Sequence, residues 1–311
     1  MARITSLIIT LAILGLGAAV RSEQAPVPTT DPLHRPLDQL LDVNVRDGLV
    51  YYRALQSSRG ALDRYVASLN VPAATYEGWS RDAKVAFWVN AYNAAVLQTV
   101  VNRYPIRGSS PAFPPSSIRQ ISGAFDQAKH RFAGRSVTLD EIDKSILPEF
   151  KDPRLTLALG RGALGSGRLR SEAFTAAKLA AQLDDIANEF VSDRHMLQVD
   201  RTAGQVSTSP ILSWHEAEFV AAYDKDVGPP FASRSPIERA LIAFVLPRLL
   251  PLEKEFVQKN DFKVTFHSFD WRLNDLSGGR IDAVNRVAPG VAPSLLHWTA
   301  GSDQPHGSRT R

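Results

Sequence analysis

Two asparagines in an apolar helix are the first residues whose chemistry needs an explanation. Residues 81–104, RDAKVAFWVNAYNAAVLQTVVNRY, predict one helix that contains Asn90 and Asn93. At 100° per residue, both amides share a face with Leu97 and Val101, so we expect them to point inward. A buried amide without partners costs about 1–3 kcal/mol. The two amides therefore either join the helix to loop backbone, or they orient or line a site.

The remaining catalytic candidates use oxygen and nitrogen, because the sequence has no cysteine. Ser166 lies between two glycines and is the candidate nucleophile. A serine needs an adjacent base, for which His215 or His130 is available. Asn90 or Asn93 would then orient the substrate or donate to an oxyanion. This set predicts acyl-transfer chemistry if the residues meet in the fold.

Two local strings resemble cofactor or metal motifs but lack the residues that the chemistry requires. Gly160 to Gly165 matches G-x-G-x-x-G, yet Ser166-Gly167 breaks the start of the helix that would bind a phosphate. His215-Glu216 begins like a zinc helix, but Phe219 occupies the position of the second histidine. We therefore predict no cofactor and no metal.

Composition limits the class of protein. The chain has 311 residues, 44% of them hydrophobic and 22% charged, which suffices for one large core or two moderate ones. The formal charge of +4 is small for this length, and the arginines are scattered. A nucleic-acid-binding protein would concentrate basic residues on one surface. We predict no nucleic-acid partner.

The N-terminus predicts export. Residues 1–22 combine Arg3, an apolar run and small residues, as in a signal peptide cleaved after Ala19 or Ser22. An uncleaved anchor is the alternative, and it would be the only membrane attachment. Residues 23–36 are a Pro-rich linker, 37–275 the folded domain, and 276–311 a loosely held tail. A cysteine-free exported chain fits the bacterial envelope, periplasmic or secreted.

The order of predicted elements indicates an α+β fold, a helix-rich single domain with a small, mostly antiparallel sheet. Hydrophobic periodicity and turn residues predict helices at 57–69, 80–104, 171–193, 213–223 and 236–250, and an acidic-start helix at 140–150. Extended segments are predicted at 131–139, 154–159, 197–207 and 263–271. We expect these segments to join one sheet, because an isolated hairpin is marginally stable in water.

The order and spacing of several strings resemble one family, domain of unknown function 547 (DUF547), of exported bacterial and plant proteins. They include FWVNAYNA, VTLDEI, DPR, LRSEAF and FDW, and the resemblance extends over residues 38–275. The family has no established activity to transfer. Together with Arg161, the polar residues of these motifs are the candidate ligand contacts: Asn90, Tyr92, Asn93, Asp140, Glu141 and Arg154.

The departures from the family pattern bear on function. Bacterial members typically carry His, Cys and Cys-Pro where this chain has Thr156, Arg161 and Ser166-Gly167. The resemblance thus implies a thiol and a base near a strand end, loosely similar to papain-like and transglutaminase-like enzymes. Every thiol is missing here, so whether this chain is an enzyme is open.

Two functions follow from the sequence. One is a serine-dependent hydrolase or acyl-transferase acting on cell-envelope amide bonds, with Ser166 and His215 as catalytic residues. The other is a non-catalytic binding or scaffold domain for an envelope ligand or protein, with a pocket between the Asn90/Asn93 helix and the Gly160–Gly167 loop. The replaced reactive positions favour the second. A histidine nitrogen within about 3.5 Å of Ser166 Oγ would favour the first.

Arg161 has two possible roles. A guanidinium stays charged, so it either pairs with a carboxylate or reaches solvent. The nearest acids of the family motifs are Asp140, Glu141 and Asp152. Pairing would make Arg161 structural, whereas an open position would make it an anion-binding residue.

Overall fold

The computed structural model describes residues 31–276. The signal peptide predicted over 1–22, most of the predicted linker, and all but the first residue of the predicted tail lie outside the described residues. The first helix, α1 (Arg35–Asn44), begins with a proline in its first turn, two residues before the predicted start of the domain. Among the described residues, no helix is both long and apolar enough to cross a membrane.

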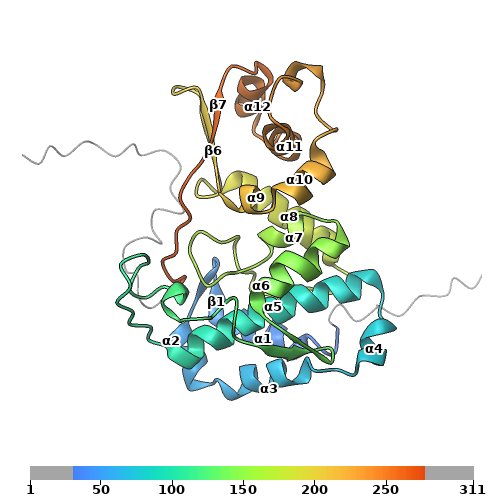
Figure 1. The fold of residues 1–311 in the computed structure, drawn as a ribbon, viewed down its shortest axis with the longest axis vertical. Helices are drawn as coiled ribbons and strands as arrows, with labels where there is room; N and C mark the ends of the chain where they lie inside the picture. Colours follow the sequence, from blue (N-terminus) through green and yellow to red (C-terminus); the bar gives the residue numbers. More distant parts are fainter. Residues whose placement is uncertain (1–30, 277–311) are drawn as a thin grey trace, which may run out of the picture.

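The fold is α+β, as predicted, with a helical first half and short strands between helices in the second (Figure 1). The first half contains α2 (Tyr52–Ser57), α3 (Gly60–Ser68), α4 (Ala73–Glu77) and the long α5 (Arg81–Arg103). The second half contains α6 (Leu139–Glu141), α7 (Arg154–Leu157), α8 (Leu179–Ser192), α9 (Ile211–Trp214), α10 (Glu216–Tyr223), α11 (Pro236–Val245) and α12 (Pro251–Gln258). One hydrophobic cluster extends from Leu37 to Leu273.

Helix α5 is the centre of the core. Ser80 caps its first turn by accepting from the backbone N–H of Ala83 at 3.2 Å, and the helix ends before the cis Tyr104–Pro105 bond. Every residue from Val85 to Leu97 is buried. The helix predicted over 80–104 is confirmed, and it is enclosed by the other elements over much of its length.

The prediction of one shared sheet is wrong. Strands β1 (Val45–Arg46) and β2 (Leu49–Val50) form one antiparallel pair, and β3 (His130–Phe132) and β4 (Arg135–Val137) form another. A separate three-stranded sheet has the order β5 (Leu197–Asp200), β6 (Gln205–Thr208), β7 (Lys263–Phe266), in which β7 is parallel to β6. The β3–β4 hairpin packs on helical segments instead, where the N–H of Ala133 donates to the carbonyl of Leu69 at 2.9 Å.

The strand predicted at 154–159 is also wrong, because its first part is helix α7. The Asp152 carboxylate accepts from the backbone N–H of Arg154 at 3.1 Å, and the Asp152 carbonyl accepts from Leu155 N–H. These bonds start a helical turn after Pro153, as an aspartate-capped turn does. Because Leu155 to Leu157 are all buried, alternation of residue size carried no information about the backbone there.

Several predicted helices have different bounds in the structure; the one predicted at 236–250, for example, ends at Val245. The helix predicted at 171–193 begins only at Leu179, because the backbone of Ala173 and Phe174 is held by side chains from α1 and α5. The segment at 139–150 is helical, but it passes from α6 through a π-helical turn (Ile142–Ile146) into a 3₁₀ turn (Leu147–Phe150). The helix predicted at 213–223 breaks at His215, between α9 and α10.

Candidate functional site

Asn90 and Asn93 join α5 to two distant loops. Asn90 is 1% exposed; its Nδ2 donates to the Phe174 carbonyl at 2.8 Å, and its Oδ1 accepts from Phe174 N–H at 2.9 Å. Asn93 is 3% exposed and bonds in the same way to the Ala158 carbonyl and the Gly160 N–H, at 3.1 and 2.8 Å. Both amides therefore connect the helix to loop backbone.

The first residues of the loop 160–167 pack directly against α5. A Cβ added at Gly160 would lie 3.6 Å from Asn93 Oδ1, and one at Gly162 would lie 3.3 Å from a methyl carbon of Val96. Gly162 also has φ +66°, a conformation that favours glycine. Side chains of α5, together with Leu169 and Ile118, thus fill the space at these two glycines, where the sequence predicted a ligand pocket.

Arg161 pairs with a carboxylate, but not with one of the three predicted acids. Its Nη2 lies 2.9 Å from Asp143 Oδ2, and the side chains of the pair are 3% and 9% exposed. The guanidinium also donates to the carbonyl and the hydroxyl of Thr156, at 3.0 and 2.8 Å. Thr156 and Arg161, two positions at which the sequence was expected to depart from the family pattern, thus contact each other.

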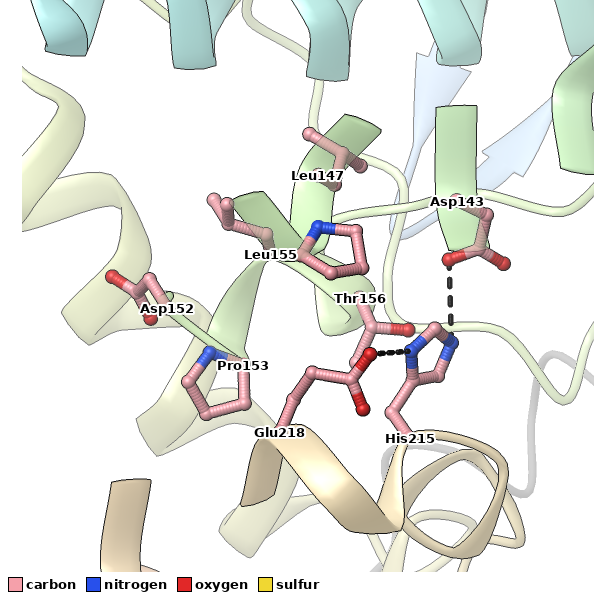
Figure 2. Close-up of a pocket in the computed structure, with 9 residues that line it drawn as sticks. Asp143, Leu147, Asp152, Pro153, Leu155, Thr156, His215 and Glu218 are labelled. Atoms are coloured by element: carbon pink, nitrogen blue, oxygen red, sulfur yellow. Dashed lines mark ion pairs between the residues drawn. The ribbon is translucent and has the colours of Figure 1, made fainter. Parts of the chain in front are cut away.

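His215 meets the other oxygen of the same carboxylate. Its Nε2 lies 3.3 Å from Asp143 Oδ1, and its Nδ1 lies 3.9 Å from Glu218 Oε1, so the ring stands between two acids (Figure 2). The contact to Asp143 is close but poorly aligned, and Asp143 Oδ1 has no hydrogen-bond donor among the described residues. Burial opposes the ionisation of Asp143, but the charge of Arg161 and the contact with His215 outweigh it and lower its pKa to about 2.

A narrow cleft opens beside this cluster. Its walls come from the π-helical and 3₁₀ turns, α7 and α10, and its volume is about 20 Å³, enough for one water-sized group. The polar lining residues are Asp143, Asp152, Thr156, His215 and Glu218 (Figure 2). Within residues 31–276, no group of three or more histidine and acidic side chains is arranged to hold a metal ion.

Ser166 contacts the backbone of the Arg161 loop. Its Oγ accepts from Arg161 N–H at 3.0 Å, and the side chain is buried. No hydrogen bond joins this hydroxyl to a histidine within the described part of the chain. The other candidate base, His130, lies in the β3–β4 hairpin with its ring on Phe132 at 5.6 Å, and burial lowers its pKa. The fold brings His215 to Asp143, and Ser166 to the backbone of Arg161.

The remaining candidate residues are distributed among separate contacts. Asp140 pairs with Lys144 at 2.6 Å, and Glu141 pairs with Lys129 at 2.8 Å and completes a capping box with Thr138. Arg154 pairs with Asp152 at 2.8 Å and also with Asp184. Tyr92 is buried, which raises the pKa of its hydroxyl. Tyr92 is close enough to Arg161 for the guanidinium to oppose this rise in its pKa, whereas Glu141 and Arg154 pair with other residues.

Asp143 is the functional residue that sequence reasoning missed. The helical period places Asp143 on the apolar face formed by Leu139, Ile142 and Ile146. A polar residue on an apolar face indicates a buried polar group, as it did for the two asparagines of α5. A carboxylate on such a face requires a cationic partner. In the structure, this cationic partner is Arg161.

These features define an α+β domain built around an asparagine-bearing central helix and a buried Asp–Arg–His cluster. Residues 76–191 match the model of a family described as "Protein of unknown function, DUF547", the family that the motifs predicted. The match includes α5, Asp143, Arg161 and Ser166, whereas His215 and Glu218 lie beyond it. The comparisons with curated proteins and with solved structures returned no match.

Proposed function

We propose that this chain is a non-catalytic binding domain rather than a serine hydrolase. The observation that carries the proposal is the position of Ser166, whose hydroxyl holds the backbone of Arg161 at 3.0 Å instead of contacting a base. A serine hydroxyl is a weak nucleophile unless a base removes its proton.

The neighbouring groups support the same reading. At the family's His and Cys positions, Thr156 and Arg161 bond to each other, and Arg161 is held by Asp143. His215 has Asp143 on one side and Glu218 on the other. The ionisable groups at the centre are therefore used to hold α7, α10 and the π-helical turn together, which suits a stable binding scaffold.

The ligand would contact the cleft beside His215 and Glu218. Glu218 is the acid there with no arginine or lysine partner among the described residues, whereas Asp143 and Asp152 pair with Arg161 and Arg154. An incompletely neutralised carboxylate at the mouth of a cleft can accept donors from a ligand. Only a small group enters the cleft, so most of the contact would lie on the surface around it.

The catalytic part of the proposal is tested with a fluorophosphonate probe, which labels activated serines. We expect no labelling of the native chain above that of a Ser166→Ala variant. Labelling that disappears in Ser166→Ala would overturn the proposal and favour the hydrolase.

The binding part is tested by calorimetric titration with soluble peptidoglycan fragments. Binding should weaken at least tenfold in Glu218→Gln and stay unchanged in Glu216→Gln, a matched control on an exposed residue of the same helix. Equal weakening in both variants, or no binding of any fragment by the native chain, would contradict the proposed cleft.

We also propose that the domain works in the bacterial envelope, periplasmic or secreted. The support is the pattern of residues 1–22, with its positive start, apolar run and small residues. Expression in a bacterial host with fractionation, followed by mass analysis of the mature N-terminus, tests it. A chain that stays in the cytoplasm with residues 1–22 intact would contradict this assignment.

A further inference from the structure

Arg119 lies among three aromatic rings at the surface. Its guanidinium carbon is 5.0 Å from the ring centre of Phe113, 5.2 Å from Trp271 and 5.6 Å from Phe125. Trp271 contacts the same two phenylalanines edge-on, with ring centres 6.1 and 6.0 Å apart. The rings thus fix the position of an exposed cation through cation–π contacts.

The side chain of Arg119 has no hydrogen bond and no acidic partner within residues 31–276, whereas Arg161 of the buried cluster pairs with Asp143. Its backbone N–H is used, donating to Ser117 Oγ at 3.1 Å. A guanidinium presents five donors in a planar fork that fits a carboxylate. The aromatic rings hold the Arg119 guanidinium in place, and its N–H groups have no partner in the described residues. The side chain is therefore positioned to bind an anionic group.

A hollow of about 430 Å³ adjoins Arg119, which is within the range of small-molecule sites. Its lining is mostly polar and includes Ser122, Asp126, Gln127 and Lys144, with Phe125 as the aromatic wall. Lys144 is neutralised by Asp140, at 2.6 Å. Asp126 has no ion-pair partner in the described part of the chain, so one free cation and one free carboxylate face the same hollow.

We infer that this hollow binds a saccharide that carries a carboxylate, such as a uronic acid unit. The carboxylate would pair with Arg119, and the ring hydroxyls would donate to Asp126 and exchange hydrogen bonds with Ser122 and Gln127. The lining consists mostly of charged and polar side chains, which suit the hydroxyls and the carboxylate of such a saccharide better than the apolar side chains of a peptide. The inference concerns a different surface from the cleft at His215 and does not depend on whether Ser166 is catalytic.

The test uses the intrinsic fluorescence of the full chain, because Trp271 lies 5.2 Å from the group that would receive the carboxylate. Glucuronic acid and its short oligomers are titrated against glucose, which lacks the carboxylate, and N-acetylglutamate, which lacks the sugar ring. We expect glucuronic acid and its oligomers to quench the tryptophan fluorescence saturably, and glucose and N-acetylglutamate to leave it unchanged. The quenching should disappear in Trp271→Phe.

The variants assign the binding to the hollow. Arg119→Gln should weaken glucuronate binding at least tenfold, and Arg119→Lys should weaken it less, because the charge stays but the fork is lost. Arg131→Gln, at an exposed arginine of β3, is the matched control and should bind as the native chain does. Equal binding by Arg119→Gln, by glucose or by N-acetylglutamate would overturn the inference.

Discussion

The buried pair of Arg161 and Asp143 makes a residue-scale prediction about stability. Arg161→Met removes the cation that compensates Asp143, leaving a buried carboxylate next to His215. Breaking such a pair typically costs about 3–5 kcal/mol, whereas replacing both members by apolar residues can be nearly neutral. We expect Arg161→Met to lower the free energy of unfolding by that amount, and Arg161→Met with Asp143→Leu to recover much of it, measured by urea denaturation.

The same carboxylate predicts an acid dependence. Burial opposes ionisation of Asp143, but Arg161 and His215 outweigh it and hold its pKa at about 2, below the ordinary value of 3.8. Because the pKa in the folded protein is the lower one, the stabilisation is complete above about pH 4 and is lost as the pH falls toward 2. The loss is on the order of 2 kcal/mol. Unfolding measured across this range should show a shallower pH slope in Asp143→Asn.

Asn90 predicts a cost of a different origin. Asn90→Leu leaves the N–H and carbonyl of Phe174 without partners in the core. Each buried unsatisfied group costs about 1–3 kcal/mol, so a loss of about 2–5 kcal/mol is expected in thermal or urea unfolding. Asn102→Ala, at an exposed position of the same helix, is the control and should change stability much less. Equal losses in the two variants would contradict the cross-linking role.

Sequence reasoning could predict the inward direction of Asn90 and Asn93, because a polar group in an apolar helix must be satisfied inside the protein. It gave pairing with an acid as one of two possible roles for Arg161. It could not choose Asp143, because that contact joins positions 18 residues apart through a π-helical turn. The contact between His215 and Asp143 depended on tertiary packing in the same way.

At the scale of elements, the loop of residues 160–167 is paired with the segment after β7. The N–H groups of Leu164 and Gly165 donate to the carbonyls of Arg272 and Asp270, both at 2.9 Å. A Cβ at Gly165 would lie 2.6 Å from the backbone nitrogen of Asp270, so Gly165→Ala must push the segments apart. We expect a loss of about 1–3 kcal/mol, as in overpacked cores.

Gly78→Ala is the matched control for Gly165→Ala in thermal unfolding. The nearest atom to an added Cβ there is a backbone oxygen at 3.6 Å, an ordinary contact. We expect its midpoint to stay close to that of the native chain, or to rise slightly as the unfolded chain loses freedom. A Gly165→Ala variant with the same midpoint would show that the loop and the segment after β7 separate without cost.

Capping and turn residues predicted the individual helices and hairpins better than they predicted how these elements pack together. Ser80 before α5, and the hairpin turns with φ +73° at Gly134 and +64° at Gly204, follow from capping and turn preferences that act within a few residues. Sheet membership depends on contacts between distant segments, so β3–β4 remained a separate pair. The start of α8 moved to Leu179 because Asn90, 84 residues earlier, holds Phe174.

At the scale of the whole molecule, the end of the described chain returns to its beginning. Asn274 accepts from Tyr52 Oη at 2.8 Å and donates to the Gly48 carbonyl at 2.9 Å, while its own carbonyl accepts from Val50 N–H at 2.8 Å. In Figure 1 the segment after β7 descends from the upper part of the view to the first hairpin, β1–β2. This segment connects the last strand of the three-stranded sheet to the N-terminal helices.

The last prediction concerns which residues the folded unit needs. A chain shortened to residues 31–276 keeps the hydrophobic cluster and every contact made by Asn274, so its unfolding midpoint in calorimetry should match that of the full chain within about 2 °C. A chain shortened to 31–262 loses β7, the partner backbone of Gly165, and Asn274, which uncovers Val206 and leaves Tyr52 buried without an acceptor. We expect this chain to lose cooperative unfolding. If it instead unfolds at the native midpoint, the segment after β7 is an appendage to the fold, and the ring cluster that holds Arg119 is dispensable for stability.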